Sequence, residues 1–467
     1  MPARACRACG PKPPHFEKKR APGQRQPCIC SHSVLSFISG PGASPRGLVQ
    51  MEQWRKNLYA LWAMQMMAFL GTSLVFPFLP LYVQDLGVVG EKAVARWSGL
   101  IFSATFLASA LFTPIWGSIG DRHGRKMMVL RANFGLCIVI GSMGLVGHAY
   151  QLLALRLLQG CLGGFVPPCL ALISTCAPKD RMGYALGFMQ TAQMGGAIIG
   201  PLLGGIMADL LGFRHVFFVT AGLIFIGGVV VSIFVTDPGV DTLSGYKSRV
   251  IPNIRFVARQ RALSGIALSM LSVSFSMSVL QPVFPLFVES LGAPKAALAT
   301  TVGALFAIAG FTNIFSAPFW GRRTDTRGAK ATLSTSLMGA AVFYFAQAFA
   351  QTIYHLAPFR LMLGLFTGGV SPSSQSIVVE NSPDSRRGGV MGVTTSISMI
   401  GNFLGPITGG FLAAVLGIRL LFVFTAVMLI LVSFAVRVLV QDTRPGGQVK
   451  AELEAEVPQP AALGGAD

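Results

Sequence analysis

The segment GSIGDRHGRK, residues 117–126, decides how the chain folds, because it connects two apolar stretches. Residues 97–119 and 127–147 carry few charges, and each is long enough to cross the ~30 Å hydrocarbon layer of a bilayer as a helix. The segment between them combines glycines, which permit a tight turn, with several basic residues. It is therefore predicted to be a short loop between two membrane helices.

The composition of the whole chain agrees with a membrane protein. Of the 467 residues, 52% are hydrophobic and only 12% are charged, whereas a soluble domain carries about a quarter charged residues. Twelve apolar stretches recur along the chain, and we predict a membrane helix in each. Their residues are 57–82, 97–119, 127–147, 150–176, 183–208, 214–236, 262–288, 298–320, 331–351, 354–379, 388–415 and 418–440.

The chain has a net charge of +19, and the distribution of its basic residues among the loops indicates how it is oriented in the membrane. Most Lys and Arg of the short loops follow the even-numbered spans, and basic loops stay in the cytoplasm. Both termini are therefore expected on the cytoplasmic side. Because topology accounts for the positive charge, we expect no nucleic-acid partner, and the lipid bilayer is the expected surrounding.

The segments outside the spans have their own compositions. Residues 1–50 form a basic extension, rich in Pro and Gly, which we expect to be disordered or not to belong to the natural product, Met51 being a better start. A zinc site at Cys6, Cys9, Cys28 and Cys30 is the alternative, but the second pair has unusual spacing, so no metal is expected. The other expected segments are a six-helix bundle at 51–236, a cytoplasmic linker at 237–261, a second six-helix bundle at 262–440 and a disordered cytoplasmic tail at 441–467.

The two sets of six spans are related by an internal repeat. When the chain is shifted by 204 or 205 residues, PIWG at 114–117 falls on PFWG at 318–321, and GPLLGG at 200–205 falls on GPITGG at 405–410. An even number of helices per repeat gives both halves the same orientation, with a pseudo-two-fold axis along the membrane normal. Substrate sites in such folds lie between the halves, and one half rocks against the other. The repeat alone favours a secondary transporter.

The motifs resemble those of the major facilitator superfamily. Residues 117–126 are similar to its signature between helices 2 and 3, RLLQG at 156–160 resembles its motif in helix 4, and residues 196–205 resemble the helix 5 motif of its drug/proton antiporters. The resemblance covers residues 51 to about 440. It implies an all-α integral membrane protein with the major facilitator fold, twelve helices in two bundles, in the bacterial inner membrane.

Two groups of residues are expected to control conformation. The repeat geometry predicts that Asp121 faces Arg387 and Gly388. By the same symmetry, Asp325 is expected to face Arg181 and Gly183. The resemblance implies that this contact latches the outward-open state; a plain topology anchor is the alternative. The small-residue spacing of the helix 5 motif predicts that this helix packs closely against a neighbour. The resemblance implies that the motif also seals helix 5 against the other half; plain packing is the alternative. These gating candidates are Gly117, Gly120, Asp121, Arg122, Gly124, Arg125, Lys126, Asp325, Gly200, Pro201, Gly204 and Gly205.

Arg156 lies inside a predicted span, where a cation is expensive, so it should face the cavity or a partner. The resemblance implies a role for Arg156 in substrate contact or proton coupling. An arginine that extends to the outer surface is the alternative. Arg360 occupies the same position in the second repeat. Further polar candidates for the transport cavity, for which interhelical hydrogen bonds are an equal alternative, are Gln65, Gln190, Gln193, Gln281 and Asn402.

The proton carrier has no assigned residue. Many drug/proton antiporters have an acid in helix 1, but residues 57–84 contain none. A proton carrier needs a titratable group, and the acids that remain lie near span ends. They are Asp85, Asp121, Asp209, Glu289 and Glu380.

We expect a secondary active exporter of small amphipathic drugs, coupled to protons, without a cofactor and monomeric. A superfamily exporter of a sugar, siderophore or other metabolite is the closer alternative. An enzyme would need clustered His and carboxylates at membrane depth, and the six His are scattered. A channel would need neither the repeat nor latch motifs on both halves.

Overall fold

A computed structural model describes residues 45–236, 250–382 and 387–440. The chain divides into two compact units, Met1–Gln50 and Met51–Asp467, and the helices below lie in the second, except that α1 begins at Pro45. The cysteines considered for zinc, the tail at 441–467 and most of the linker lie outside the described residues. The surroundings of Gly117 and Gly120 and the side chains of Asp121 and Arg122 also lie outside the description, although the backbone of these four residues is helical.

Helices α1 to α8 form the first half of the fold. The first predicted span is a nearly continuous rod in which α1 runs into a 3₁₀ turn, Phe76–Phe78, and then α2. The fourth predicted span is broken into α5 and α6. The bounds are α1 (Pro45–Val75), α2 (Leu79–Asp85), α3 (Glu91–His123), α4 (Arg125–Met143), α5 (Ala149–Leu162), α6 (Val166–Cys176), α7 (Met182–Leu211) and α8 (Phe213–Phe234).

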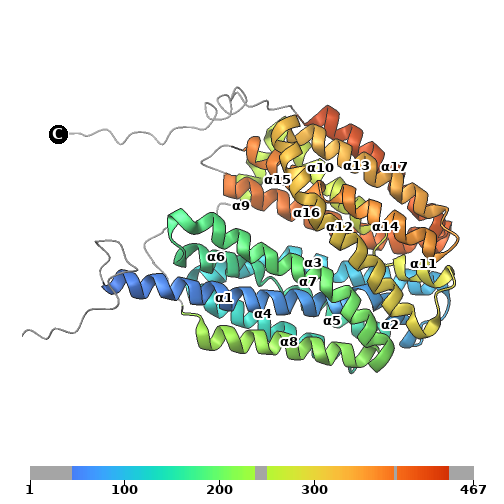
Figure 1. The fold of residues 1–467 in the computed structure, drawn as a ribbon, viewed down its shortest axis with the longest axis horizontal. Coiled ribbons are helices and arrows are strands. Elements are labelled where there is room, and N and C mark those ends of the chain that lie inside the picture. Colours follow the sequence, from blue (N-terminus) through green and yellow to red (C-terminus); the bar gives the residue numbers. More distant parts are fainter. Residues whose placement is uncertain (1–44, 237–249, 383–386, 441–467) are drawn as a thin grey trace, which may run out of the picture. The chain divides into compact units, whose positions relative to one another are not determined.

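Helices α10 to α17 repeat this arrangement in the second half, after the short linker helix α9 (Val250–Arg259). Figure 1 shows the blue-to-green helices gathered in one bundle and the yellow-to-red helices in another. The bounds are α10 (Arg261–Ser278), α11 (Phe284–Ser290), α12 (Leu298–Arg327), α13 (Ala329–Ala348), α14 (Ile353–Thr367), α15 (Val370–Glu380), α16 (Arg387–Leu416) and α17 (Ile418–Leu439).

Nine segments within the described ranges are long and apolar enough to cross a membrane, so the protein is a multi-pass membrane protein. The three remaining predicted spans coincide with α10–α11, α13 and α14–α15. Two of these are interrupted, which shortens their helices, and the third is rich in Ala, Ser and Thr, which lowers its hydropathy. The all-helical fold is confirmed for the described residues, and the count of twelve crossings stays a prediction.

Glycine and proline account for the breaks between helices. Gly124 joins α3 to α4 with a φ of 93°, and Gly328 joins α12 to α13 with a φ of 88°, values that other residues rarely adopt. The gap between α5 and α6 contains Gly164, with a φ of 86°, and α6 restarts with Pro near its first position. The turns are therefore specified locally by the sequence.

The internal repeat is also visible in side-chain contacts. The indole of Trp116 donates a 2.6 Å hydrogen bond to the carbonyl of Cys161, and that of Trp320 donates a 2.7 Å bond to Leu365. Both residues of the second bond lie 204 positions after those of the first. The repeat seen in the sequence is thus a repeat of tertiary structure.

Candidate functional site

The two halves meet most closely along two helix pairs, α3 with α16 and α7 with α12. We call the end where α7 and α16 finish and α3 and α12 begin the closed end. Towards the middle of α3 and α16, the Oγ of Ser103 donates a 2.7 Å hydrogen bond to the carbonyl of Phe403. A Cβ atom on Gly99 would lie 2.6 Å from the carbonyl oxygen of Pro406, so only glycine fits. The halves therefore touch backbone to backbone at this end.

The predicted gating motif of helix 5 lies partly on this interface. Gly205 leaves no room for a Cβ against the carbonyl of Ala299 in α12, whereas Gly200 and Gly204 pack on α1 within their own half. The carbonyl of Pro201 lies against Gly303 of α12. The motif thus uses one face to pack inside its bundle and the other to contact the second half. Gly124 lies in the turn between α3 and α4, away from this interface.

Asp209 fastens the closed end with two hydrogen bonds between the halves. Its carboxylate, at the end of α7, accepts bonds from the backbone N–H of Ala299 at 3.1 Å and of Thr300 at 2.7 Å. These amides lie in the first turn of α12, where backbone N–H groups lack a partner within the helix. The carboxylate also faces the positive end of the helix dipole. The sequence alone indicates Asp209 only as a candidate proton carrier.

The pseudo-symmetric position has no such carboxylate, and the helix starts explain the difference. Ala414 occupies the position that the repeat relates to Asp209. On that side α3 begins at Glu91, so the N–H of Ala95, the counterpart of Ala299, already lies inside a helix. In the second half a 3₁₀ turn, Lys295–Ala297, precedes α12 and leaves its first amides free. An acceptor for the first amides of a helix is therefore required only where α7 meets α12, and Asp209 supplies it.

A second polar contact joins the halves close to their axis. The amide of Gln84 in α2 donates a 3.0 Å hydrogen bond to the carboxylate of Glu289 in α11. The two residues are 205 positions apart and therefore equivalent in the repeat. Equivalent residues meet only at a two-fold axis, so this bond marks its position at the closed end.

At the opposite end the predicted latch of the second half is not formed. Asp325 is exposed at the end of α12, and the structure gives it no bond to Arg181 or Gly183. The Nε of Arg181 lies 3.9 Å from its neighbour Asp180 instead. The side chains of the first-half latch, Asp121 with Arg387 and Gly388, lie outside the described residues. Arg125 and Lys126 bond to backbone carbonyls of α6 and of the end of α8.

A cavity of about 270 Å³ lies in the second half, towards this end. It is lined by α10, α15 and the first half of α16, and the described residues that line it are uncharged. They include six hydroxyl side chains and two flexible methionines. Members of this lining are Met270, Ser371, Ser374, Met391, Thr394 and Thr395. Sequence reasoning missed this set, although Ser and Thr at helical spacing inside apolar spans were the available signal.

The two predicted arginines are both buried but differ in their surroundings. Arg156 is 8% exposed, and its guanidinium donates a 3.1 Å hydrogen bond to the side chain of Gln159. Arg360 is 6% exposed and lies 3.4 Å above the ring of Phe284. This burial argues against an arginine that extends to the outer surface, because both charges lie within the protein.

The predicted amides are placed in different surroundings. Gln65 is fully buried, and neither polar atom of its amide group has a hydrogen-bond partner among the described residues. Within the same described ranges, Gln193 and Gln281 each have one buried amide atom without a partner. Gln190 is exposed, and Asn402 is partly buried in α16. A buried amide without a hydrogen-bond partner costs free energy. Such groups are typical of positions where a ligand or a water molecule supplies the missing bond.

The repeat, the apolar helices and the hydroxyl-lined cavity are typical of a membrane transporter. A family model described as Major Facilitator Superfamily matches residues 61–310 and 266–464, and the chain belongs to this family. Its relatives are transporters and not enzymes, as the sequence predicted.

The chain is similar to curated proteins and to solved structures. It is 36% identical to the multidrug resistance protein MdtG of Salmonella paratyphi A over 373 residues, which cover 80% of this chain and 92% of the relative. The corresponding identity to MdtG of Salmonella typhimurium is 35%. Among solved structures, a bacterial homologue of the lysosomal transporter Spinster, inward-facing and unoccupied, has a TM-score of 0.67 at 17% identity and covers 83% of this chain and 98% of its own. A D-xylose–proton symporter has a TM-score of 0.68 at 14% identity, covering 84% and 99%.

Proposed function

We propose that the protein exports small amphipathic compounds by alternating access, in exchange for protons, and that this structure is the state open to the cytoplasm. The observation that carries the proposal is the difference between the two ends. Asp209 and the glycine contacts join the halves at one end, whereas Asp325 and Arg181 are apart at the other. The basic loops of the second end indicate that it faces the cytoplasm.

Two further points support drugs as the cargo. The curated relatives are named multidrug resistance proteins, and the chain covers nearly all of their length. The cavity wall combines methionines, which adapt to many apolar shapes, with hydroxyls that bond to polar groups. Such a wall suits compounds with an apolar body and an uncharged polar end.

Export of a neutral metabolite is the second candidate. The hydroxyl groups of Ser371, Ser374, Thr394 and Thr395 favour it, because sugars bind through hydroxyl and amide partners. A sugar site holds several ligand hydroxyls at once, whereas a drug site needs few polar contacts. The two candidates therefore differ in how far transport depends on these side chains.

The decisive experiment expresses the full chain in a bacterium that lacks its major efflux pumps and measures accumulation of a fluorescent amphipathic dye. We expect lower accumulation than with an empty vector, and recovery when a protonophore removes the proton gradient. Equal accumulation with vector and protein argues against drug export. Low accumulation that a protonophore leaves unchanged argues against proton coupling.

A further inference from the structure

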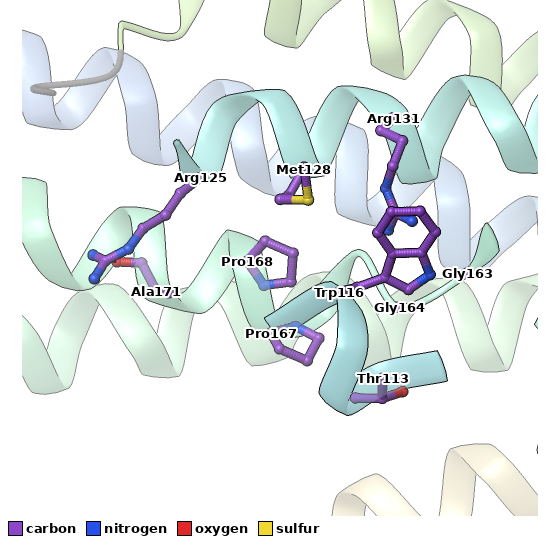
Figure 2. Close-up of a pocket in the computed structure, with 10 residues that line it drawn as sticks. All are labelled: Thr113, Trp116, Arg125, Met128, Arg131, Gly163, Gly164, Pro167, Pro168 and Ala171. Atoms are coloured by element: carbon purple, nitrogen blue, oxygen red, sulfur yellow. The ribbon is translucent and has the colours of Figure 1, made fainter. Parts of the chain in front are cut away.

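A second cavity lies entirely within the first half. It has a volume of about 180 Å³ and lies between α3, α4 and the break that separates α5 from α6. Figure 2 shows Arg131 reaching from α4 onto the indole of Trp116, with Gly163 and Gly164 beside the ring. Arg125 lies at the other side of the same cavity. This cavity is separate from the hydroxyl-lined cavity of the second half.

Within the part of the chain that the structure describes, Arg131 has no hydrogen-bond partner. Its guanidinium carbon lies 3.4 Å from the centroid of the Trp116 ring, and its three nitrogens are buried with no acceptor among the described residues. A cation inside a membrane span is expensive, and stacking on a ring leaves the five N–H donors unsatisfied. The described residues therefore supply no hydrogen-bond acceptor for Arg131. A ligand with acceptor oxygens that enters the cavity would form several hydrogen bonds with its N–H groups.

The charge of the lining favours an anion. Among the described residues that line the cavity, Arg125 and Arg131 are the charged ones, and both are cations. Arg125 uses one N–H for the carbonyl of Ala171, at 2.7 Å, which keeps it at the cavity wall. The guanidinium fork of arginine matches the oxygens of a phosphate or carboxylate.

The depth of the cavity favours a phosphate group at the membrane surface. Arg131 lies six residues after Arg125, the first residue of α4, which corresponds to about 9 Å along the helix. That places it just below the headgroup region of the leaflet that the basic loops face. The cavity volume of about 180 Å³ is several times the ~30 Å³ that one water molecule occupies in the liquid, so a phosphate group fits into the cavity. The cavity is smaller than the pockets that hold drug-sized molecules.

The second half shows that the fold does not require this arginine. Trp320 is equivalent to Trp116 and makes the equivalent hydrogen bond, but Thr335 stands where the repeat places Arg131. The hydroxyl of Thr335 bonds to the backbone of its own helix. The helices of the second half thus pack in the same way with Thr335 at this position. The guanidinium of Arg131 is therefore not needed for helix packing.

We propose that this cavity is a phosphate-binding site in which Arg131, with Arg125 at its edge, holds the headgroup phosphate of an anionic phospholipid. Arg131 moves off the ring of Trp116 far enough to direct its N–H groups to the phosphate oxygens. Basic pockets between membrane helices on the cytoplasmic side are a known setting for anionic headgroups. The site goes beyond the proposed export function, because binding needs no transport.

The test uses the purified full chain in an uncharged detergent. Thermal stability and native mass spectrometry are recorded with phosphatidylglycerol, with diacylglycerol, which lacks the phosphate, and with inorganic phosphate. We expect phosphatidylglycerol to raise the melting temperature and to be retained, with the apparent affinity roughly tenfold weaker in Arg131→Gln, since a charge-assisted pair is lost. Arg322→Gln, which removes an exposed cation at the end of α12, is the control and should respond as the wild type does.

Several outcomes decide the proposal. Equal responses of wild type and Arg131→Gln overturn it, and so does a diacylglycerol effect as large as that of phosphatidylglycerol. An effect of inorganic phosphate that depends on Arg131 and matches that of the lipid assigns the site to free phosphate and overturns the lipid. If Arg131→Gln is not stable enough to purify, Arg131→Lys keeps the charge but loses the fork, and unchanged retention of the lipid in that variant contradicts the arginine geometry.

Discussion

Replacement of Asp209 by Ala should weaken the closed end. The substitution removes both acceptors of the first amides of α12, which lie at 3.1 and 2.7 Å in the wild type. Hydrogen bonds to a charged group contribute roughly 1.5–3 kcal/mol each when buried. Because Asp209 is partly exposed and water replaces the lost acceptors, we expect a loss of only about 1–2 kcal/mol. That corresponds to a roughly 5- to 30-fold shift towards opening at this end.

The assay measures how fast a cysteine in the closed interface reacts. Ser103 is 1% exposed and bonds to Phe403 of the other half, so Ser103→Cys reacts with a membrane-impermeant thiol reagent only when the halves separate. In a background in which the native cysteines are replaced, Asp209→Ala should increase the labelling rate by the same 5- to 30-fold. Asp85→Asn removes an exposed acid at the same end, and it should leave the rate unchanged.

The reasoning is refuted in two ways. An unchanged labelling rate in Asp209→Ala means that the two hydrogen bonds do not hold the halves together. An equal increase in Asp85→Asn means that the net charge of this end, and not the contact with α12, controls opening. Asp209→Asn retains one acceptor oxygen and should fall between the wild type and Asp209→Ala.

Three further variants test other parts of the mechanism. Gly205→Ala should abolish dye export without loss of folded protein, because the added Cβ collides with α12 when the halves close. Gly222→Ala is the control and should export normally, because there is open space around Gly222. Equal export by the two variants contradicts a role of the interface. Arg156→Ala leaves Gln159 without its partner and should reduce export at least tenfold in the dye assay, and unchanged export removes Arg156 from the mechanism. Ser374→Ala should change the relative export of neutral dyes by about two- to fivefold and leave total expression unchanged, and an unaltered dye profile places the substrate elsewhere.

The sequence was most informative where a property is local or repeated. Gly124 and Gly328 could be predicted as turns because positive φ is a property of single residues. The match of PIWG with PFWG predicted equivalent surroundings for Trp116 and Trp320, and their hydrogen bonds are indeed equivalent. The family followed from motifs that the family model also matches.

The candidate site was less predictable, because its contacts join residues that are distant in the sequence. Asp209 bonds to Ala299, which is 90 residues away in the sequence. No residue near Asp209 in the sequence indicates that the first backbone N–H groups of α12 need an acceptor. The hydroxyl-lined cavity is formed from α10, α15 and α16, none of which is unusual by itself. Arg131 lies within the predicted span 127–147, and the sequence could not tell that its guanidinium would lack a partner among the described residues.

The sequence by itself determined the membrane helices, the two related halves and the turns, because hydropathy, repetition and glycine conformations act over short range. Only the tertiary structure decided which end is closed and which residue fastens it. The two halves have similar sequences, but α12 starts after a 3₁₀ turn and α3 does not, so Asp209 is needed on one side and Ala414 suffices on the other. That difference depends on where a helix begins in relation to a distant side chain, which no local pattern specifies.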